Sequence, residues 1–414
     1  MKTKFQKYPK YKDSGIEWLG EIPEGWEVKK VKSIGKVVVG GTPKTDNMSY
    51  WENGEISWLP SGMVQNKTLI RDDVYTFITK KGLQESAAKI VKENSVLLAM
   101  TGATCGNVAL ITFPSSFNQS VAGIECNSEI DSRYIYYSLM GANPKILSYR
   151  MGGAQSGINK YIVKNLELSM PRYETQLHVA DFLDEKTKII DAMIEKKQKL
   201  IELLREKRTS LITRAVTKGL DPNARMKSSG VDWIGEIPEE WEVRRLKFIA
   251  FLQYGDSLPN EKRENGEIEV FGSNGPIGFH SKANTKSPVI IVGRKGSFGA
   301  INFTEKEVFA IDTTYFIDGR FSKSHLKWLA YSLLVAKLND ISLDTGVPGL
   351  SRESVHNKYF PFPTIQVQKQ IADFLDHETS KIDKAIELIE TQIEKLKEYR
   401  ALLIFNSVTG KIKI

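Results

Sequence analysis

The feature that most constrains the fold of this chain is an internal repeat. The sequence SGIEWLGEIPEGWEV, which begins at Ser14, returns as SGVDWIGEIPEEWEV from Ser229, and ADFLD at Ala180 returns as ADFLD at Ala372. A repeat of this kind constrains the architecture before any single residue is interpreted, because each copy has to form the same kind of unit. The sequence therefore predicts a tandem duplication, in which the stretch between the repeated segments is shorter in the second copy.

The interiors of the two copies, roughly residues 35–173 and 249–363, are predicted to be globular α/β units. Runs such as Val289–Val292 are apolar or β-branched and end at Gly, Ser or Pro, as short buried strands do. TCG at Thr104 corresponds to SFG at Ser297, which favours one fold for both units. Hydrophobic residues make up 41% of the chain and charged residues 26%, as in folded domains rather than disordered chains.

Two segments, Gln176 to Val216 and Gln366 to Val408, contain no Gly or Pro and are rich in Glu, Lys, Leu and Ile, which is typical of long helices. Apolar residues recur in both at the seven-residue spacing of a coiled-coil seam. These residues are Leu183, Ile190, Ile194, Ile201, Leu204 and Leu211 in the first segment and Leu375, Ile382, Ile386, Ile389, Ile393, Leu396 and Leu403 in the second. A helix of about forty residues is about 60 Å long, which exceeds the diameter of a domain of this size. We therefore expect the helices to extend beyond their domains and pack against each other in opposite directions.

The predicted fold class is α+β, with two related globular α/β domains joined by two long antiparallel coiled-coil helices. Duplicated units commonly adopt twofold symmetry, so a pseudo-twofold arrangement is expected. The expected division gives residues 1–175 to the first domain, 176–217 to the first helix, 218–365 to the second domain, and 366–414 to the second helix and the C-terminal tail.

Patterns typical of enzymes and metal sites are missing from the sequence. It has no GxxxxGK[ST] loop, no GxGxxG after a strand and no GxSxG elbow. The two cysteines and five histidines do not stand at metal-ligand spacing. The acid pairs Asp181/Asp184 and Asp373/Asp376 are interpreted as partners of the helix dipole in the opening turns of the two helices. The sequence therefore predicts no catalytic residue, no metal ligand and no cofactor bound to this chain.

The chain is moderately basic, with 58 Lys and Arg against 50 Asp and Glu and a net charge of +8, which favours polyanionic partners. It has no run of 18 uncharged apolar residues, and its N-terminal sequence MKTKFQKYPKYK lacks the apolar stretch of a signal peptide. We therefore expect no membrane partner, no export and a cytoplasmic location.

Polar loops on the two units suit the reading of duplex DNA, because Arg, Lys, Asn, Gln, Ser and Thr contact base edges and phosphates. In the first unit the candidates are Thr42, Lys44, Ser61, Thr101, Thr104, Asn118, Gln119, Gln155, Ser156 and Asn159. In the second unit they are Ser273, Asn274, Lys282, Lys286, Arg294, Lys295, Ser297, Thr313, Thr314 and Ser351. Each residue taken alone is a common turn residue or solvated charge, so the hypothesis concerns the set.

The repeated frame carries two tryptophans in each copy, Trp18 and Trp26 in the first and Trp233 and Trp241 in the second. Two interpretations are open. The rings pack where the chain enters each domain, or the frames are docking surfaces that recruit two copies of one partner protein.

Several of these motifs together resemble the specificity subunit of type I restriction-modification enzymes. They are IPEGW at Ile22 and IPEEW at Ile237, GGTPKT at Gly40, GIN at Gly157, GLS at Gly349, and the two ADFLD segments. The resemblance covers nearly the whole chain. It implies that each globular unit is a target recognition domain for one half of a bipartite, asymmetric DNA target, with the two helices as a spacer.

The resemblance also implies partners. Two modification subunits would bind the repeated frames and helices, carry S-adenosylmethionine and methylate adenine at N6, and a restriction (motor-nuclease) subunit would join them. This chain lacks the Asn-Pro-Pro-Tyr/Phe signature of those methyltransferases, since its nearest match is Asn143-Pro144 followed by Lys. It is therefore expected to be non-catalytic.

The alternative of a different class is a coiled-coil adaptor that scaffolds partner proteins without base readout. A DNA reader requires an affinity that depends on salt and falls on single base changes, whereas an adaptor shows neither property.

Overall fold

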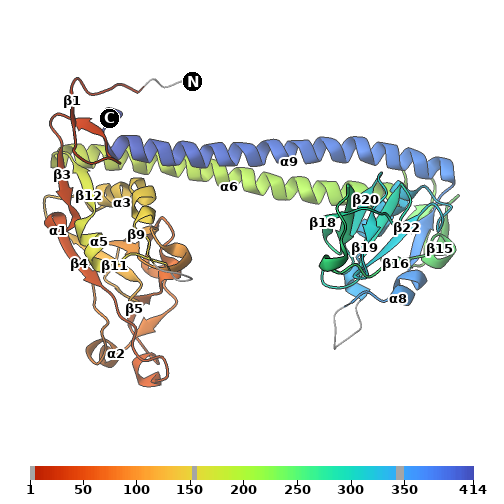
Figure 1. Cartoon of the computed structure of the whole chain (residues 1–414), viewed down its shortest axis with the longest axis horizontal. Coiled ribbons are helices and arrows are strands. Elements are labelled where there is room, and N and C mark those ends of the chain that lie inside the picture. The colour runs from red at the N-terminus through yellow and green to blue at the C-terminus, as the bar shows by residue number, and fades with distance from the viewer. Residues whose placement is uncertain (1–4, 152–155, 342–348) are drawn as a thin grey trace. The chain divides into compact units, whose positions relative to one another are not determined.

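The computed structural model describes residues 5–151, 156–341 and 349–414. The chain forms two compact units, of which the first comprises Met1–Lys197 and Thr391–Ile414 and the second Gln198–Glu390. Two long helices, α6 (Tyr173–Lys218) and α9 (Ile365–Val408), each contribute residues to both units (Figure 1). The expected division into four segments separated these helices from the domains, whereas each compact unit includes part of both helices.

The first unit is built on two sheets. A five-stranded sheet has the order β4-β11-β8-β9-β6, with β4 (Gly35–Val39), β6 (Lys67–Leu69), β8 (Val96–Ala99), β9 (Val108–Ile111) and β11 (Val121–Cys126). A three-stranded sheet has the order β10-β5-β7, with β5 (Ile56–Leu59), β7 (Phe77–Ile78) and β10 (Ser116–Phe117). The pairs β1 (Tyr11–Asp13) with β2 (Glu21–Pro23) and β3 (Glu27–Lys30) with β12 (Glu167–Met170) complete its strands. Its shorter helices are α1 (Val31–Ile34), α2 (Lys80–Gln84), α3 (Ser132–Gly141), α4 (Asn143–Ser148) and α5 (Lys160–Asn165).

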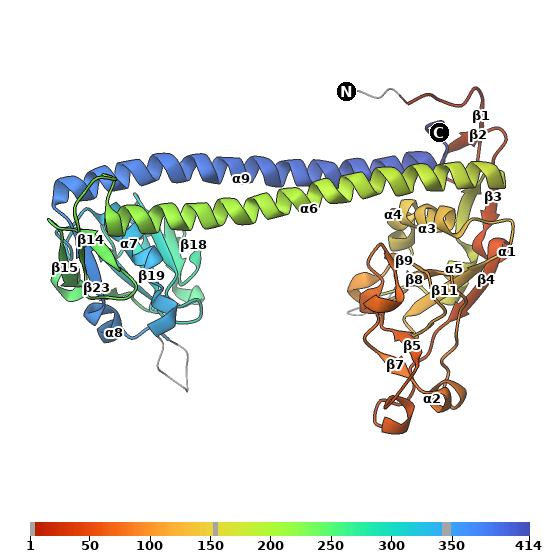
Figure 2. The same ribbon diagram turned by 180° about the vertical axis from the view of Figure 1, so that it is seen from behind.

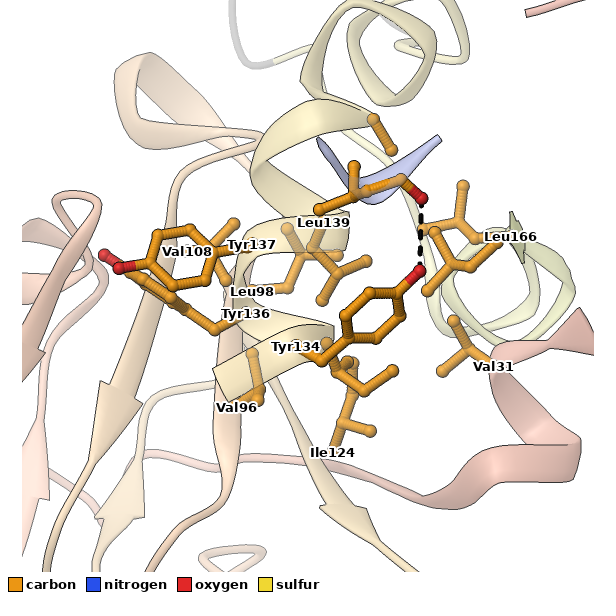
Figure 3. Packing of buried hydrophobic residues seen from close by; sticks show 14 of the residues in the cluster. Val31, Val96, Leu98, Val108, Ile124, Tyr134, Tyr136, Tyr137, Leu139 and Leu166 are labelled. Carbon is orange, nitrogen blue, oxygen red and sulfur yellow. Dashed lines mark hydrogen bonds between the residues drawn. The ribbon is translucent and has the colours of Figure 1, made fainter. Parts of the chain in front are cut away.

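The continuous apolar run of β8 is explained by burial on both faces of the sheet. Val96 and Leu98 pack in one core cluster with α3, whereas Leu97 and Ala99 pack in a second cluster with the three-stranded sheet, as side chains alternate along a strand. Tyr134 of α3 is fully buried among apolar side chains (Figure 3). Its hydroxyl lies within hydrogen-bond distance of the carbonyl oxygens of Ser169 and Val408, at 2.9 and 3.1 Å. In both views of the first unit, α3 lies between the sheet and α6 (Figure 2).

The second unit repeats this arrangement with fewer strands. Its larger sheet has the order β16-β22-β19-β20, with β16 (Gln253–Tyr254), β19 (Val289–Gly293), β20 (Ile301–Thr304) and β22 (Thr314–Asp318). Its three-stranded sheet joins β17 (Ile268–Gly272), β18 (Gly275–His280) and β21 (Phe309–Ala310), and the pairs are β13 (Met226–Ser228) with β14 (Glu236–Pro238) and β15 (Glu242–Arg245) with β23 (Tyr359–Phe362). Its shorter helices are α7 (Leu326–Val335) and α8 (Arg352–Asn357).

Matching pairings confirm that the two units share one fold. The central strand β8 pairs antiparallel with β11 and β9, and β19 pairs antiparallel with β22 and β20. In the smaller sheets, β10 runs parallel to β5 and β21 runs parallel to β17. The predicted strand at Val289–Val292 is β19, and the predicted α+β class is confirmed.

The two long helices run antiparallel within each unit. In the first unit Arg400 pairs with Asp191 at 2.8 Å, and in the second Arg208 pairs with Asp383 at 2.8 Å. In the second unit, moving from Arg208 back to Arg205 changes the partner from Asp383 to Glu390, so numbers rise on one helix as they fall on the other. All thirteen predicted seam residues are buried or half-buried in their own unit. Arg208 and Arg400 interrupt the apolar repeat, and the ion pairs explain why the interruption is tolerated.

The tryptophans of the repeated frames belong to the cores of their units. Trp26 and Trp241 are 4% and 6% exposed, and Trp26 lies edge-on to Tyr8 with 5.7 Å between ring centroids. Trp18 and Trp233 are half-buried, and Trp233 packs against Phe360. This burial supports the packing interpretation of the frames, and docking of a partner on the four tryptophans stays a prediction.

The interpretation of the acid pairs as partners of the helix dipole is wrong. Because α6 begins at Tyr173, Asp181 and Asp184 lie beyond the first turn, where the dipole acts. Asp184 instead accepts hydrogen bonds from Tyr137 at 2.7 Å and Arg133 at 2.9 Å, and so ties α3 to α6. In the second unit the same arrangement ties α7 to α9 through Tyr331, Lys327 and Asp376.

Candidate nucleic-acid interface

In the first unit, polar loops meet at one end of the central strands. Because β8 and β11 are antiparallel, the carboxyl end of β8 at Ala99 pairs with the amino end of β11 at Val121. Just beyond β8, Thr101 forms an isolated antiparallel β-bridge with Gly157. The amide of Ile158 donates to the carbonyl of Met100 at 2.8 Å. Loops distant in sequence therefore share one edge of the sheet.

Four predicted DNA contacts, Thr42, Thr101, Asn118 and Gln119, lie at this edge. The hydroxyl of Thr42 donates a hydrogen bond to the side-chain oxygen of Gln119. Gln119 is exposed. The chain passes close behind them at Gly40, where a Cβ atom would collide with the carbonyl oxygens of Phe117 and Asn118. The predicted residue Ser156 flanks Gly157 in the same segment and is half-buried, and Gln155 lies outside the described residues.

Arg150 also belongs to this edge and was missed by sequence reasoning. The Nη2 atom of Arg150 donates to the carbonyl of Gly102 at 3.1 Å. The next residue in the sequence, Met151, forms an isolated antiparallel β-bridge with Gly157. An isolated arginine after a short helix carries no periodic or motif signal, so only the fold could place it here.

The second unit brings loops together at the equivalent end of its sheet. The amides of Arg294 and Lys295 donate to the carbonyl of Thr313 at 2.9 and 3.1 Å, and the Ser273 hydroxyl donates to the same oxygen at 2.7 Å. Lys295 forms an isolated antiparallel β-bridge with Gly349, as Thr101 does with Gly157 in the first unit. Four predicted residues therefore lie together here.

Aromatic rings support the arginines of this second edge. The Arg294 guanidinium lies over the rings of Tyr254 and Tyr315, 4.9 and 5.8 Å from their centroids. Burial raises the pKa of Tyr315, and its hydroxyl donates to the carbonyl of Leu350 at 2.9 Å. Arg352 lies 4.6 Å from the centroid of the Tyr254 ring. Tyr254 and Arg352 were not among the predicted residues, because nothing in the sequence joins positions so far apart.

Among the residues that the structure describes, no group of three or more His, Cys, Asp or Glu side chains is arranged to hold a metal ion. None of the helices formed by these residues has the length and apolar character of a membrane-spanning segment.

Comparison with known proteins identifies the chain. The family described as type I restriction modification DNA specificity domain matches residues 23–203 and 238–398. The chain belongs to this family. It is a specificity subunit of the type I restriction-modification systems, a non-catalytic DNA-recognition protein, and its two units contain its two target recognition domains.

Individual relatives of this specificity subunit agree with the assignment. The MjaVIII specificity subunit of Methanocaldococcus jannaschii is 24% identical over 425 residues, which cover 95% of this chain and 94% of the relative. The MjaIX specificity subunit of the same organism is 28% identical over 284 residues, or 67% of this chain and 61% of the relative. A solved structure from a study of complex assembly in a type I restriction-modification system has the same fold, with a TM-score of 0.72 at 14% identity. The match spans 94% of this chain and 98% of the solved chain.

Several predicted contact residues of the specificity subunit have other structural roles. Asn159 and Ser351 cap the amino ends of α5 and α8, where their side-chain oxygens accept backbone N–H groups at 3.0 and 3.4 Å. Thr314 is fully buried, and its hydroxyl donates to the carbonyl of Ile311 at 2.7 Å. The fold already uses the polar atoms of these three side chains, and their contact with DNA stays a prediction.

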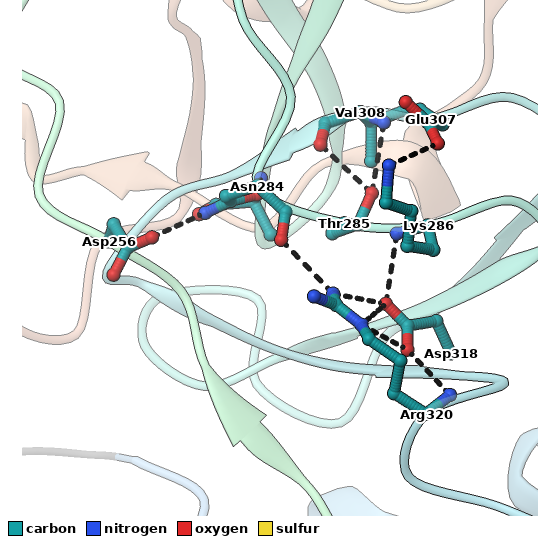
Figure 4. A network of polar contacts seen from close by, with 9 residues as sticks. Asp256, Asn284, Thr285, Lys286, Glu307, Val308, Asp318 and Arg320 are labelled. Atoms are coloured by element: carbon teal, nitrogen blue, oxygen red, sulfur yellow. Dashed lines mark hydrogen bonds and ion pairs between the residues drawn. The ribbon is translucent and has the colours of Figure 1, made fainter.

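Lys286 lies at the opposite end of the second domain from the loop edge around Arg294, and its contact with DNA stays a prediction. Its amide donates to Asp318, which pairs with Val289 at the end of β19 opposite Gly293 (Figure 4). The Lys286 ammonium pairs with Glu307 at 3.0 Å. Burial acts to raise the pKa of Asp318, but hydrogen bonds from Arg320 and the Lys286 amide outweigh it and hold that pKa below its ordinary value. Lys286 therefore belongs to a structural network.

The remaining predicted residues lie on surface loops of their domains, and their role stays a prediction. In the first domain they are the exposed Lys44 and the half-buried Ser61 and Thr104. In the second they are the exposed Asn274, Lys282 and Ser297.

Proposed function

We propose that each target recognition domain reads one half of a bipartite, asymmetric DNA target through the loop edge described above. The observation that carries this proposal is that two units of one fold present equivalent edges with different side chains. The first edge offers hydroxyl and amide groups around Gln119 together with one arginine, Arg150, and the second offers the cations Arg294 and Lys295. Because base edges are distinguished by their donors and acceptors, unlike edges imply unlike half-sites.

We also propose the partners of the complex. Two modification subunits would dock on this chain, bind S-adenosylmethionine and methylate adenine at N6, and a restriction subunit would join for cleavage. A base has to leave the helix before its methylation, so those subunits would perform the extrusion while this chain selects the site. The complex would act on double-stranded DNA in the cytoplasm.

A domain exchange tests the readout. The segment 35–173 is replaced by the corresponding segment of another specificity subunit, and methylated sites are mapped genome-wide in a host that carries the partner subunits. We expect one half-site to change while the other half-site stays the same. Exchange of 249–363 is the matched control and should change only the other half-site. A change of both half-sites in either exchange would refute independent reading.

The two long helices are proposed to set the gap between the half-sites. Inserting one heptad into both α6 and α9, next to Lys197 and Thr391 where the compact units divide, preserves the seam. The added rise of about 10 Å corresponds to at most about 3 base pairs. The same insertion in α6 alone breaks the seam and serves as the control. A methylation map with an unchanged gap in the double insertion would show that the helices do not measure the spacing.

A further inference from the structure

The second target recognition domain holds two arginines against one exposed tyrosine ring. The guanidinium groups of Arg294 and Arg352 lie 4.9 and 4.6 Å from the centroid of the Tyr254 ring. Tyr254 is 44% exposed, so the group is on the surface. Arg352 also lies 5.2 Å from the ring centroid of Phe251, which is 42% exposed. We call Arg294, Tyr254 and Arg352 the arginine–tyrosine stack.

The charge of the stack is not balanced within its domain. Over the residues that the structure describes, neither Arg294 nor Arg352 has a carboxylate within 4.0 Å, whereas Arg320 and Arg208 of the same unit are ion-paired. Each guanidinium gains from the face of an aromatic ring, but two cations at one ring repel each other. A polyanion laid on this surface would remove that repulsion.

The orientation of Arg294 is fixed at both ends of the residue. Its amide donates to Thr313 and its carbonyl accepts from Leu350, each at 2.9 Å. At the tip, Nη1 donates to the carbonyl of Asp312 at 3.0 Å. A guanidinium has five N–H donors, and this contact uses one of them. A planar fork held in this way suits the paired O6 and N7 acceptors of guanine, which are the commonest specific target of arginine in the major groove.

Arg352 is held less firmly. In the described part of the chain its guanidinium makes no hydrogen bond or ion pair, and it lies over the rings of Tyr254 and Phe251. A cation with this freedom suits a phosphate, which is a sequence-independent contact that positions the duplex.

Among the described residues of the first domain, no two arginines lie over one aromatic ring. The repeat places Val39 before Gly40 where the second domain has Tyr254 before Gly255, and Lys160 follows the cap Asn159 where Arg352 follows Ser351. The stack is therefore a property of the second domain and not of the shared fold.

We propose that Arg294 reads a guanine in the half-site bound by the second domain, that Arg352 holds a neighbouring phosphate, and that Tyr254 positions both side chains. This inference rests on the proposed function, because it assigns the reading of one base pair within one half-site.

The test is competition binding of the full chain, in complex with its modification subunits, to its mapped target and to every single-base-pair variant at several salt concentrations. In Arg294→Lys, which keeps the charge but loses the fork, preference at one G·C pair of the second half-site should fall about 10- to 100-fold. Discrimination in the first half-site and at the other base pairs of the second half-site should be unchanged, and the second of these results shows that the mutated domain is folded.

Two further variants separate the roles within the stack. Arg352→Ala should weaken binding to all sequences alike and reduce the slope of log K against log salt by about 0.9. Tyr254→Ala should reproduce both losses in part, and Tyr254→Phe, which keeps the ring, should restore them. Arg245→Lys is the matched control, because Arg245 also lies over a tyrosine ring, that of Tyr359 at 5.1 Å, but outside the loop edge, and it should leave base preference unchanged.

The outcomes distinguish this inference from the proposed function. Arg294→Lys with unchanged base preference, or with equal weakening on every sequence, overturns the reading of guanine by Arg294. A wild-type complex that binds all duplexes equally overturns the proposed function itself.

Discussion

The loop edges of the two target recognition domains occupy equivalent places and present different chemistry. Around Gln119 the first edge is made of hydroxyl and amide groups, with Arg150 tied to a backbone carbonyl. The second edge carries Arg294, Lys295 and Arg352. The backbone that supports these side chains is alike in the two domains, including the isolated β-bridges at Gly157 and Gly349. A duplicated fold thus keeps its strands and bridges while the side chains at one end of the sheet diverge.

The largest expected effect comes from the shared backbone. A Cβ atom on Gly40 would collide with backbone oxygens of Phe117 and Asn118, and one on Gly255 with those of Ile311 and Ala310. We expect Gly40→Ala and Gly255→Ala each to destabilise their own unit by about 3 kcal/mol, at the upper end of overpacking costs. Hydrogen exchange resolved by peptide measures each unit separately.

Gly25→Ala is the control for this pair, since no atom lies within 4 Å of the added methyl group. If Gly40→Ala and Gly255→Ala differed strongly in cost, or left exchange unchanged, the two edges would not share one backbone constraint.

The next effect concerns the opposite end of the sheets, where both domains use a carboxylate to hold a loop. Asp318 accepts the Lys286 amide at 2.9 Å, and Glu125 accepts the Lys92 amide at 3.1 Å. Asp318 is fully buried and also bonded by Arg320, whereas Glu125 is half-buried. We expect Asp318→Asn to cost about 2 kcal/mol and Glu125→Gln less than about 1 kcal/mol, as measured by urea unfolding monitored separately in each unit.

The pKa of Asp318 gives this difference a pH signature. Because the folded-state pKa lies below the ordinary value, the carboxylate stabilises the domain above the unfolded pKa of about 4, and that stability is lost as the pH falls through the folded pKa. Asp318→Asn should remove this part of the acid sensitivity of the second unit. An unchanged acid transition would show that the network of Figure 4 contributes nothing to stability.

These two ends of the sheet also show how far the sequence could predict the structure. Local signals placed the strand at Val289–Val292 and both long helices, because hydrophobic spacing and the absence of Gly and Pro act over short distances. The pairing of Lys286 with Asp318 was not predicted, because the two residues lie 32 positions apart and sequence patterns do not reveal such pairing. Arg150 and Arg352 were missed for the same reason, since tertiary contacts to residues distant in sequence bring them to the loop edges.

A smaller effect should separate the chemistry of the two edges. Lys295 is exposed and cationic, whereas Gln119 is exposed and neutral. If Lys295 contacts a phosphate, Lys295→Ala should reduce the salt slope of DNA binding by about 0.9, and Gln119→Ala should leave that slope unchanged while it alters base preference in the first half-site. Titrations of the assembled complex at several salt concentrations measure both quantities. Equal slopes for the two variants would contradict the chemical difference between the edges.

The smallest expected effect on stability concerns two ion pairs that occupy equivalent places in the two units. Arg208 and Arg400 occupy equivalent positions on the long helices, and each pairs with an aspartate of the facing helix at 2.8 Å. Their aspartate partners are about half exposed, at 52% each, so solvent screens both pairs and each is expected to contribute less than about 1 kcal/mol. Arg208→Ala and Arg400→Ala should therefore cost nearly the same free energy of unfolding in their respective units. A marked inequality would show that the helix packing has diverged as the loop edges have, and that the shared scaffold ends at the domain boundary.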